Sequence, residues 1–151
     1  MKHLHPSFVL ICLIMTLPII SRACFMMIPL EELVKSSPVI VSGKITAVTV
    51  SPQRKGEGPQ LQDTGFLRVD RVLKNTLKDF DITVGDRLPL KFPSQNRIMH
   101  ISTDIVYRKG QEGVWILDYR DGAFYATYPG DLQSLDQLTA IENLVPTPAS
   151  P

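Results

Sequence analysis

Cys24 is the residue whose chemistry depends most on its place in the chain, because it directly follows a pattern typical of a secretory signal peptide. Lys2 supplies a positive charge, residues 8–20 form an apolar run with few interruptions, and residues 21–23 (Ser-Arg-Ala) end in a small side chain. The run is short for a membrane span. We therefore predict that residues 1–23 are a signal peptide and that the protein is exported, either periplasmic or secreted. A retained N-terminal membrane anchor is the alternative.

Cleavage after residue 23 would leave Cys24 as the first residue and the only cysteine of the mature chain, since Cys12 would be removed. An intramolecular disulfide would then be impossible, although the compartment would permit one. A cysteine at this position can be lipidated, but Ser21 stands where lipoprotein signals usually carry Leu. The sequence predicts either lipidation or a free N-terminal thiol at Cys24. Membrane contact is expected only if Cys24 is lipidated or the signal segment is retained.

Catalytic chemistry has little support, because His100 would be the only histidine of the mature chain. A catalytic triad would need His100 to meet a carboxylate and a nucleophile, and no Ser or Cys lies in a nucleophile-elbow sequence. One His and one Cys cannot form a structural zinc site. We predict no catalytic residue, no metal site and no cofactor, and hence a protein that is not an enzyme.

Nucleic-acid binding would need exposed aromatic side chains in a positive groove. One stretch joins an aromatic residue to cations, namely Phe66 with Arg68, Arg71 and Lys74. Removal of residues 1–23 leaves 14 of the 16 basic residues against 15 acidic ones, so no strong positive field is expected. We predict that Phe66 lies in the core beside solvated charges and that the protein does not bind nucleic acid.

A helix and a long strand are predicted to organise the domain. Residues 29–36 place Pro and two Glu at the start of a helix and Lys near its end, as the helix dipole favours. Residues 39–50 follow as a strand whose apolar phase changes partway, so we expect a bend or bulge at Gly43. Long, bent first strands of this kind serve both halves of a small barrel.

Two further strands are expected at residues 64–74 and 86–92. In the first of them, alternation places Leu67, Val69 and Leu73 on one face and Phe66 and Val72 on the other. In the second, it predicts that Leu88, Leu90 and Phe92 face inward. Pro89 cannot donate a ladder hydrogen bond, so its strand is expected at a sheet edge or with its free side toward water.

Asp121-Gly122 lies between two apolar runs and predicts a type I′ hairpin turn. The register would pair Tyr119 with Phe124, Leu117 with Ala126 and Trp115 with Tyr128, all on one core face. Tyr125 is predicted to point outward. A polar turn from Lys109 to Gly113 precedes this hairpin, and its Gln and Glu either cap backbone groups or meet a partner. Both Tyr125 and this turn therefore remain open as parts of a binding surface.

A C-terminal helix is predicted from Ser134, where Ser134 and Gln137 match a capping box, with Leu135, Leu138 and Ile141 on one side. It ends before Pro146, and residues 146–151 are expected to be a disordered, proline-rich tail. Residues 24–145 then form one domain: a mostly β, small antiparallel OB-like barrel with a short N-terminal helix and a C-terminal helix.

The stretches LEELVKSSPVIVSGKITAV, FLRVDRVLKN and GQEGVWILDYRDGAFY, in this order, resemble a group of uncharacterised exported bacterial proteins over residues 29–144. The resemblance implies export and an OB-type barrel of the sort also found in tissue inhibitors of metalloproteases, with no assigned activity. In those inhibitors an N-terminal cysteine reaches the protease zinc, and Cys24 matches that position, although Met26 replaces the second cysteine of their Cys-x-Cys start.

We expect an exported, non-enzymatic binding module of the bacterial cell envelope, with another envelope protein as its partner. The alternative is a protease-inhibitor-like protein that acts through Cys24.

Overall fold

The computed structural model describes residues 27–52, 61–97 and 104–146. The predicted signal peptide, Cys24, His100 and all of the proline-rich tail except Pro146 lie outside the described residues. No helix in the described part of the chain is long and apolar enough to cross a membrane. The elements, in chain order, are α2 (Leu30–Ser36), β1 (Val39–Thr49), β2 (Gln62–Asn75), β3 (Arg87–Pro93), β4 (Glu112–Arg120), β5 (Ala123–Tyr125), the 3-10 helix η1 (Pro129–Asp131), β6 (Leu132–Gln133), the 3-10 helix η2 (Leu135–Gln137) and α3 (Leu138–Leu144).

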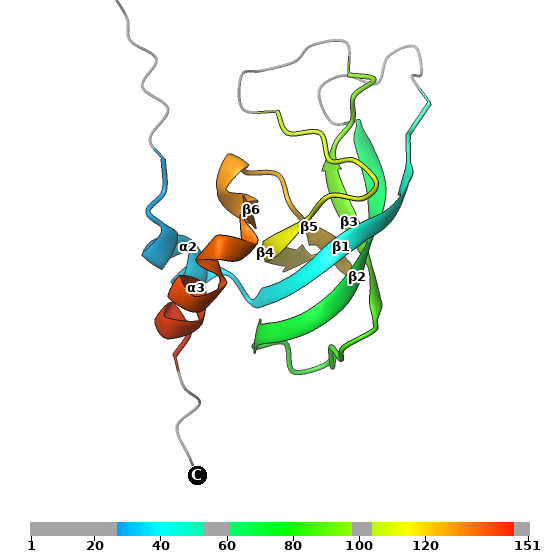
Figure 1. The fold of residues 1–151 in the computed structure, drawn as a ribbon. Coiled ribbons are helices and arrows are strands. Elements are labelled where there is room, and N and C mark those ends of the chain that lie inside the picture. The colour runs from blue at the N-terminus through cyan, green and yellow to red at the C-terminus, as the bar shows by residue number, and fades with distance from the viewer. Residues whose placement is uncertain (1–26, 53–60, 98–103, 147–151) are drawn as a thin grey trace, which may run out of the picture.

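Five strands close into a small barrel, with both helices on one side of it (Figure 1). The strand order is β1-β2-β3-β5-β4, and β4 pairs back to β1, which closes the barrel. Every pairing is antiparallel except β3 with β5. β6 adds a short pairing to β4. The predicted mostly β, OB-like barrel with two short helices is thus confirmed.

The bend in β1 lies where the sequence predicts it. Its register with β2 shifts at three points, one of them between Ser42 and Gly43. A Cβ at Gly43 would overlap the backbone carbonyl oxygen of Arg68, so only glycine fits this crossing of the two strands. The carbonyl oxygen of Gly43 accepts a hydrogen bond from Nε1 of buried Trp115 at 3.0 Å, which ties β1 to β4.

β1 buries side chains on both of its faces. Val39, Val41 and Ile45 point into the barrel, while Ile40 packs outward against a second cluster beneath the helices. That second cluster joins Ile40 to these residues of α2, β4 and α3: Leu33, Val34, Val114, Ile116 and Ile141. The helices therefore cover the outward side of β4 and of the first half of β1 (Figure 1).

The predicted hairpin is present, but it is shorter than expected. Tyr119 pairs with Phe124, and positive φ angles at Asp121 (51°) and Gly122 (74°) fit the I′ turn. β5 ends at Tyr125, after which the chain turns away from β4. The predicted Trp115–Tyr128 pair is therefore wrong: Leu132 of β6 lies opposite Trp115, and Tyr128 packs in the cluster under the helices.

Two further side chains lie elsewhere than predicted, and of the two placements predicted for the strand of Pro89 the structure excludes one, the sheet edge. Leu73 packs in the outer cluster with the helices, because register shifts after Val69 reverse the phase of β2. Leu135 is 45% exposed, because the first turn after Ser134 is a 3-10 helix, in which residues do not keep the α-helical spacing. Pro89 is not on an edge strand, but pairing of β3 with β5 begins only at Leu90, so the missing N–H of Pro89 costs no bond there.

Candidate binding face

The outward side of β2, β3 and the second half of β1 is not covered by the helices, and it carries a row of three cations. Lys44 of β1 lies opposite Arg68 of β2, and Arg68 lies opposite Arg87 of β3. Glu112 of β4 lies opposite Lys44 and ends the row. We call Lys44, Arg68 and Arg87 the basic row.

Like charges directly opposite one another on neighbouring strands destabilise a sheet. Exposed carboxylates reduce this repulsion at two members of the basic row. Lys44 pairs with Glu112 and Arg68 with Asp70, both at 3.1 Å. Exposed pairs of this kind contribute little to stability, about 0–1 kcal/mol each. The row thus brings like charges side by side with little compensation from these pairs.

Phe66 lies on this same outward side, beside the basic row. It is half-buried, it faces Pro89 across the strand pair, and the guanidinium carbon of Arg87 lies 4.2 Å from its ring centroid. The prediction that Phe66 lies in the core is therefore wrong. The alternation of β2 sends the neighbouring Leu67 inward and Phe66 outward, and the cation–π contact places the guanidinium of Arg87 over the ring.

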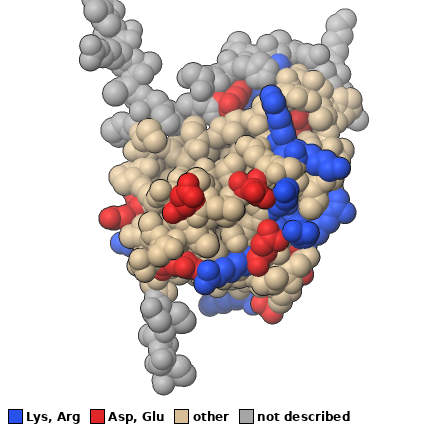
Figure 2. Space-filling model, viewed as in Figure 1, with Lys and Arg blue, Asp and Glu red and all other residues tan. Residues whose placement is uncertain are grey.

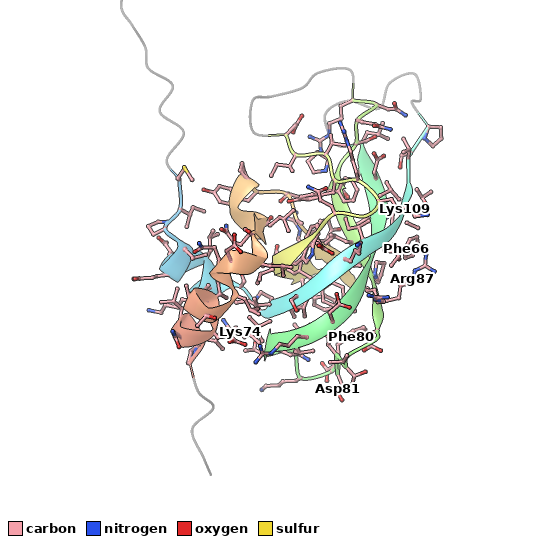
Figure 3. The ribbon with its side chains drawn as sticks, viewed as in Figure 1. Phe66, Lys74, Phe80, Asp81, Arg87 and Lys109 are labelled. Atoms are coloured by element: carbon pink, nitrogen blue, oxygen red, sulfur yellow. The ribbon has the colours of Figure 1, made fainter. Side chains whose placement is uncertain are left out.

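Figure 2 shows Lys and Arg side chains gathered along one side of the molecule. In Figure 3, Phe66, Arg87 and Lys109 lie along that side of the barrel. The turn that holds Lys109 contacts β1 directly, since the N–H of Gly110 donates to the carbonyl of Ile45 at 2.8 Å. We call the basic row together with Phe66, Pro89, Lys91 and Lys109 the basic face.

The polar turn from Lys109 to Gly113, which contributes Lys109 to the basic face, also has structural roles. Gly110 adopts a positive φ of 89°, and Oε1 of Gln111 accepts a hydrogen bond from the N–H of Arg108 at 2.9 Å. Glu112 pairs with Lys44, as described above. The predicted capping by Gln111 is confirmed, while contact of this turn with a partner stays a prediction. Tyr125 is half-buried, with the guanidinium of Arg120 at 4.2 Å from its ring.

Two cations that the sequence groups with Phe66 belong to the helices instead. Arg71 forms an ion pair with Glu142 of α3 at 2.6 Å. Lys74 donates to the last carbonyls of α2, those of Val34 and Lys35, at 2.8 and 3.0 Å, and burial lowers its pKa. Only Arg68 of the three lies beside Phe66.

A buried polar cluster that sequence reasoning missed fixes the other end of the barrel. Asp63, 1% exposed, accepts hydrogen bonds from the N–H groups of Ser51 and Gln95. Arg97 donates to the carbonyl of Leu61 and pairs with Asp104, each at 2.9 Å. These contacts hold together the chain segments next to residues 53–60 and 98–103.

Asp131 has the most perturbed carboxyl pKa of the described residues. Burial raises it from 3.8 to about 6, against the hydrogen bonds that the N–H groups of Thr127 and Tyr128 donate to it. The hydroxyl of Tyr128 accepts a hydrogen bond from the N–H of Ile28 at 2.7 Å, so this turn also holds the start of the described chain.

The described residues contain no group of His, Cys, Asp and Glu able to hold a metal ion. No protein-family model matches the chain, and no curated protein matches its sequence. The resemblance to exported bacterial proteins thus stays a prediction.

Proposed function

We propose that this protein is an exported, non-enzymatic binding module of the bacterial cell envelope and that it holds another envelope protein on its basic face. The single observation that carries the proposal is the basic row, three cations side by side on neighbouring strands, on a sheet surface that the described helices leave uncovered. Such a surface attracts acidic partners and orients them more than it adds affinity.

The neighbouring apolar pair strengthens this proposal. Phe66 and Pro89 lie opposite one another next to the cations, and aromatic and Arg side chains are enriched where proteins bind each other. This surface has cations around a partly exposed aromatic ring. It therefore fits a protein partner whose surface has acidic residues around an apolar side chain.

Carbodiimide crosslinking tests the proposal, because the reagent joins lysine amines only to carboxylates in direct contact. We expect the tagged protein, expressed in a bacterial host, to form an adduct with one envelope protein through the lysines of the basic face. Lys44→Arg, Lys91→Arg and Lys109→Arg together keep the charge but should abolish the adduct. The matched control, Lys35→Arg with Lys78→Arg, should retain it. An adduct that persists in the first variant and disappears in the second would contradict the proposal.

A second candidate, inhibition through Cys24, has one observation in its favour. The Tyr128–Ile28 hydrogen bond anchors the chain four residues after Cys24, and an anchored terminus loses less entropy on binding. The intact mass of the exported protein tests its premise: a chain that begins with an unmodified Cys24 keeps the candidate, whereas a diacylglycerol adduct or an uncleaved chain removes it. Lipidation would instead tether the basic-face module to the membrane.

A further inference from the structure

The spacing and sign of the charges on the basic face restrict the conformation of a partner segment that can bind there. The outward row across four strands reads Glu112, Lys44, Arg68, Arg87, one negative charge followed by three positive ones. Adjacent strands lie about 4.8 Å apart, so the three cations span about 10 Å at their strand positions.

We propose that the partner segment is an acidic α-helix that lies across the strands, along this row. In a helix, side chains at i, i+3 or i+4, and i+7 share one face, and the rise of about 1.5 Å per residue places i and i+7 about 10.5 Å apart. This matches the span of the basic row. An extended peptide repeats the same face every ~6.7 Å, so three acidic residues would span about 13 Å and miss the outer cations.

Glu112 gives the row a direction. It is 55% exposed at the side chain and lies at the end next to Lys44. A fourth acidic residue of the helix at this end would lie opposite Glu112 and be repelled by its charge. Lys or Arg one turn before the first acidic residue would instead be attracted to Glu112. Phe66 and Pro89 lie two residues along their strands from Arg68 and Arg87, on the same outward side, which fits an apolar side chain on the flank of the acidic face.

The inference rests on the proposed function, and synthetic helices test it separately. The probe is a side-chain-stapled helix with Lys at i−4, Glu at i, i+4 and i+7, and Leu on the flank, measured by fluorescence anisotropy with the mature protein at physiological salt. A control helix of identical composition has its three Glu spread around the helix. We expect the probe to bind at least about tenfold more tightly than the control. Arg68→Glu with Arg87→Glu should remove this difference, and Lys35→Glu with Lys78→Glu should leave it.

Equal binding of both helices, still sensitive to Arg68→Glu with Arg87→Glu, would overturn the helical register and leave the basic face as the binding surface. Tighter binding of a linear polyanion such as heparin than of the probe would overturn the inference in favour of a polymeric ligand. Binding by none of these ligands would overturn the inference, and the proposed function would then be judged by the envelope crosslinking alone.

Discussion

Asp131 should make the stability of this fold depend on pH, and an amide at this position should remove the dependence. Burial is the main cause of its raised pKa, and the negative charge of Asp118 adds to it. The N–H groups of Thr127 and Tyr128 donate to Oδ2, which lowers the pKa but does not offset the burial. Asn can accept the same two hydrogen bonds without a charge.

The sign follows from the direction of the shift. A folded pKa of about 6 against an ordinary value of 3.8 means that the folded state binds this proton more tightly than the unfolded state. The contribution of Asp131 to the stability of the fold is thus most favourable below about pH 4, falls as the pH rises toward about 6, and is constant above that value. The two pKa values correspond to a loss of at most about 3 kcal/mol, since one unit is about 1.4 kcal/mol.

The assay is urea denaturation of wild type and Asp131→Asn at a series of pH values from about 4 to about 8. The difference between the two proteins isolates Asp131 from the other carboxyl groups. We expect it to be small at about pH 4 and to grow in favour of Asn, reaching its full value above about pH 6. A constant difference across this range, or one that grows in favour of the wild type, would refute the reasoning.

Four other substitutions probe the framework of the barrel, each measured as a urea denaturation midpoint. Gly43→Ala should cost about 3 kcal/mol, because its Cβ has no room at the β1–β2 crossing; a neutral effect would mean that the strands do not cross so closely. Trp115→Phe should cost about 1–3 kcal/mol, because the buried carbonyl of Gly43 loses its donor; an unchanged midpoint would show that this bond contributes nothing. Arg97→Met should cost about 3 kcal/mol, since the side chain of Asp104 is only 7% exposed, whereas Arg71→Met, at an exposed pair, should cost less than about 1 kcal/mol. Equal losses for the two Arg variants would contradict the assigned burial.

The parts of the fold that sequence predicted best are those determined by neighbouring residues. The helix before β1, the bend at Gly43 and the Asp121-Gly122 turn each depend on a few adjacent side chains with strong conformational preferences. Leu73 and Tyr128 were misplaced for the opposite reason. A bulge in β2 and the early end of β5 depend on strand partners that lie far away in the sequence.

The basic row shows the same limit at the candidate site. Lys44, Arg68 and Arg87 are separated by many residues, and only the register of three strands brings them side by side. Sequence grouped Phe66 with Arg71 and Lys74 because they are neighbours along the chain, but both cations are bound to the helices. The near-neutral total charge also gave no indication that positive charges predominate on one surface.

The most direct test of the central claim is a map of photo-crosslinks from single positions around the barrel, made in intact envelopes. A photoreactive amino acid would replace Pro89 on the basic face, Lys78 in the β2–β3 connection or Glu31 on α2, all of which are exposed. The account predicts a specific protein adduct from position 89 and none from positions 78 and 31. Adducts from position 31 alone would place the partner on the helices and contradict the account.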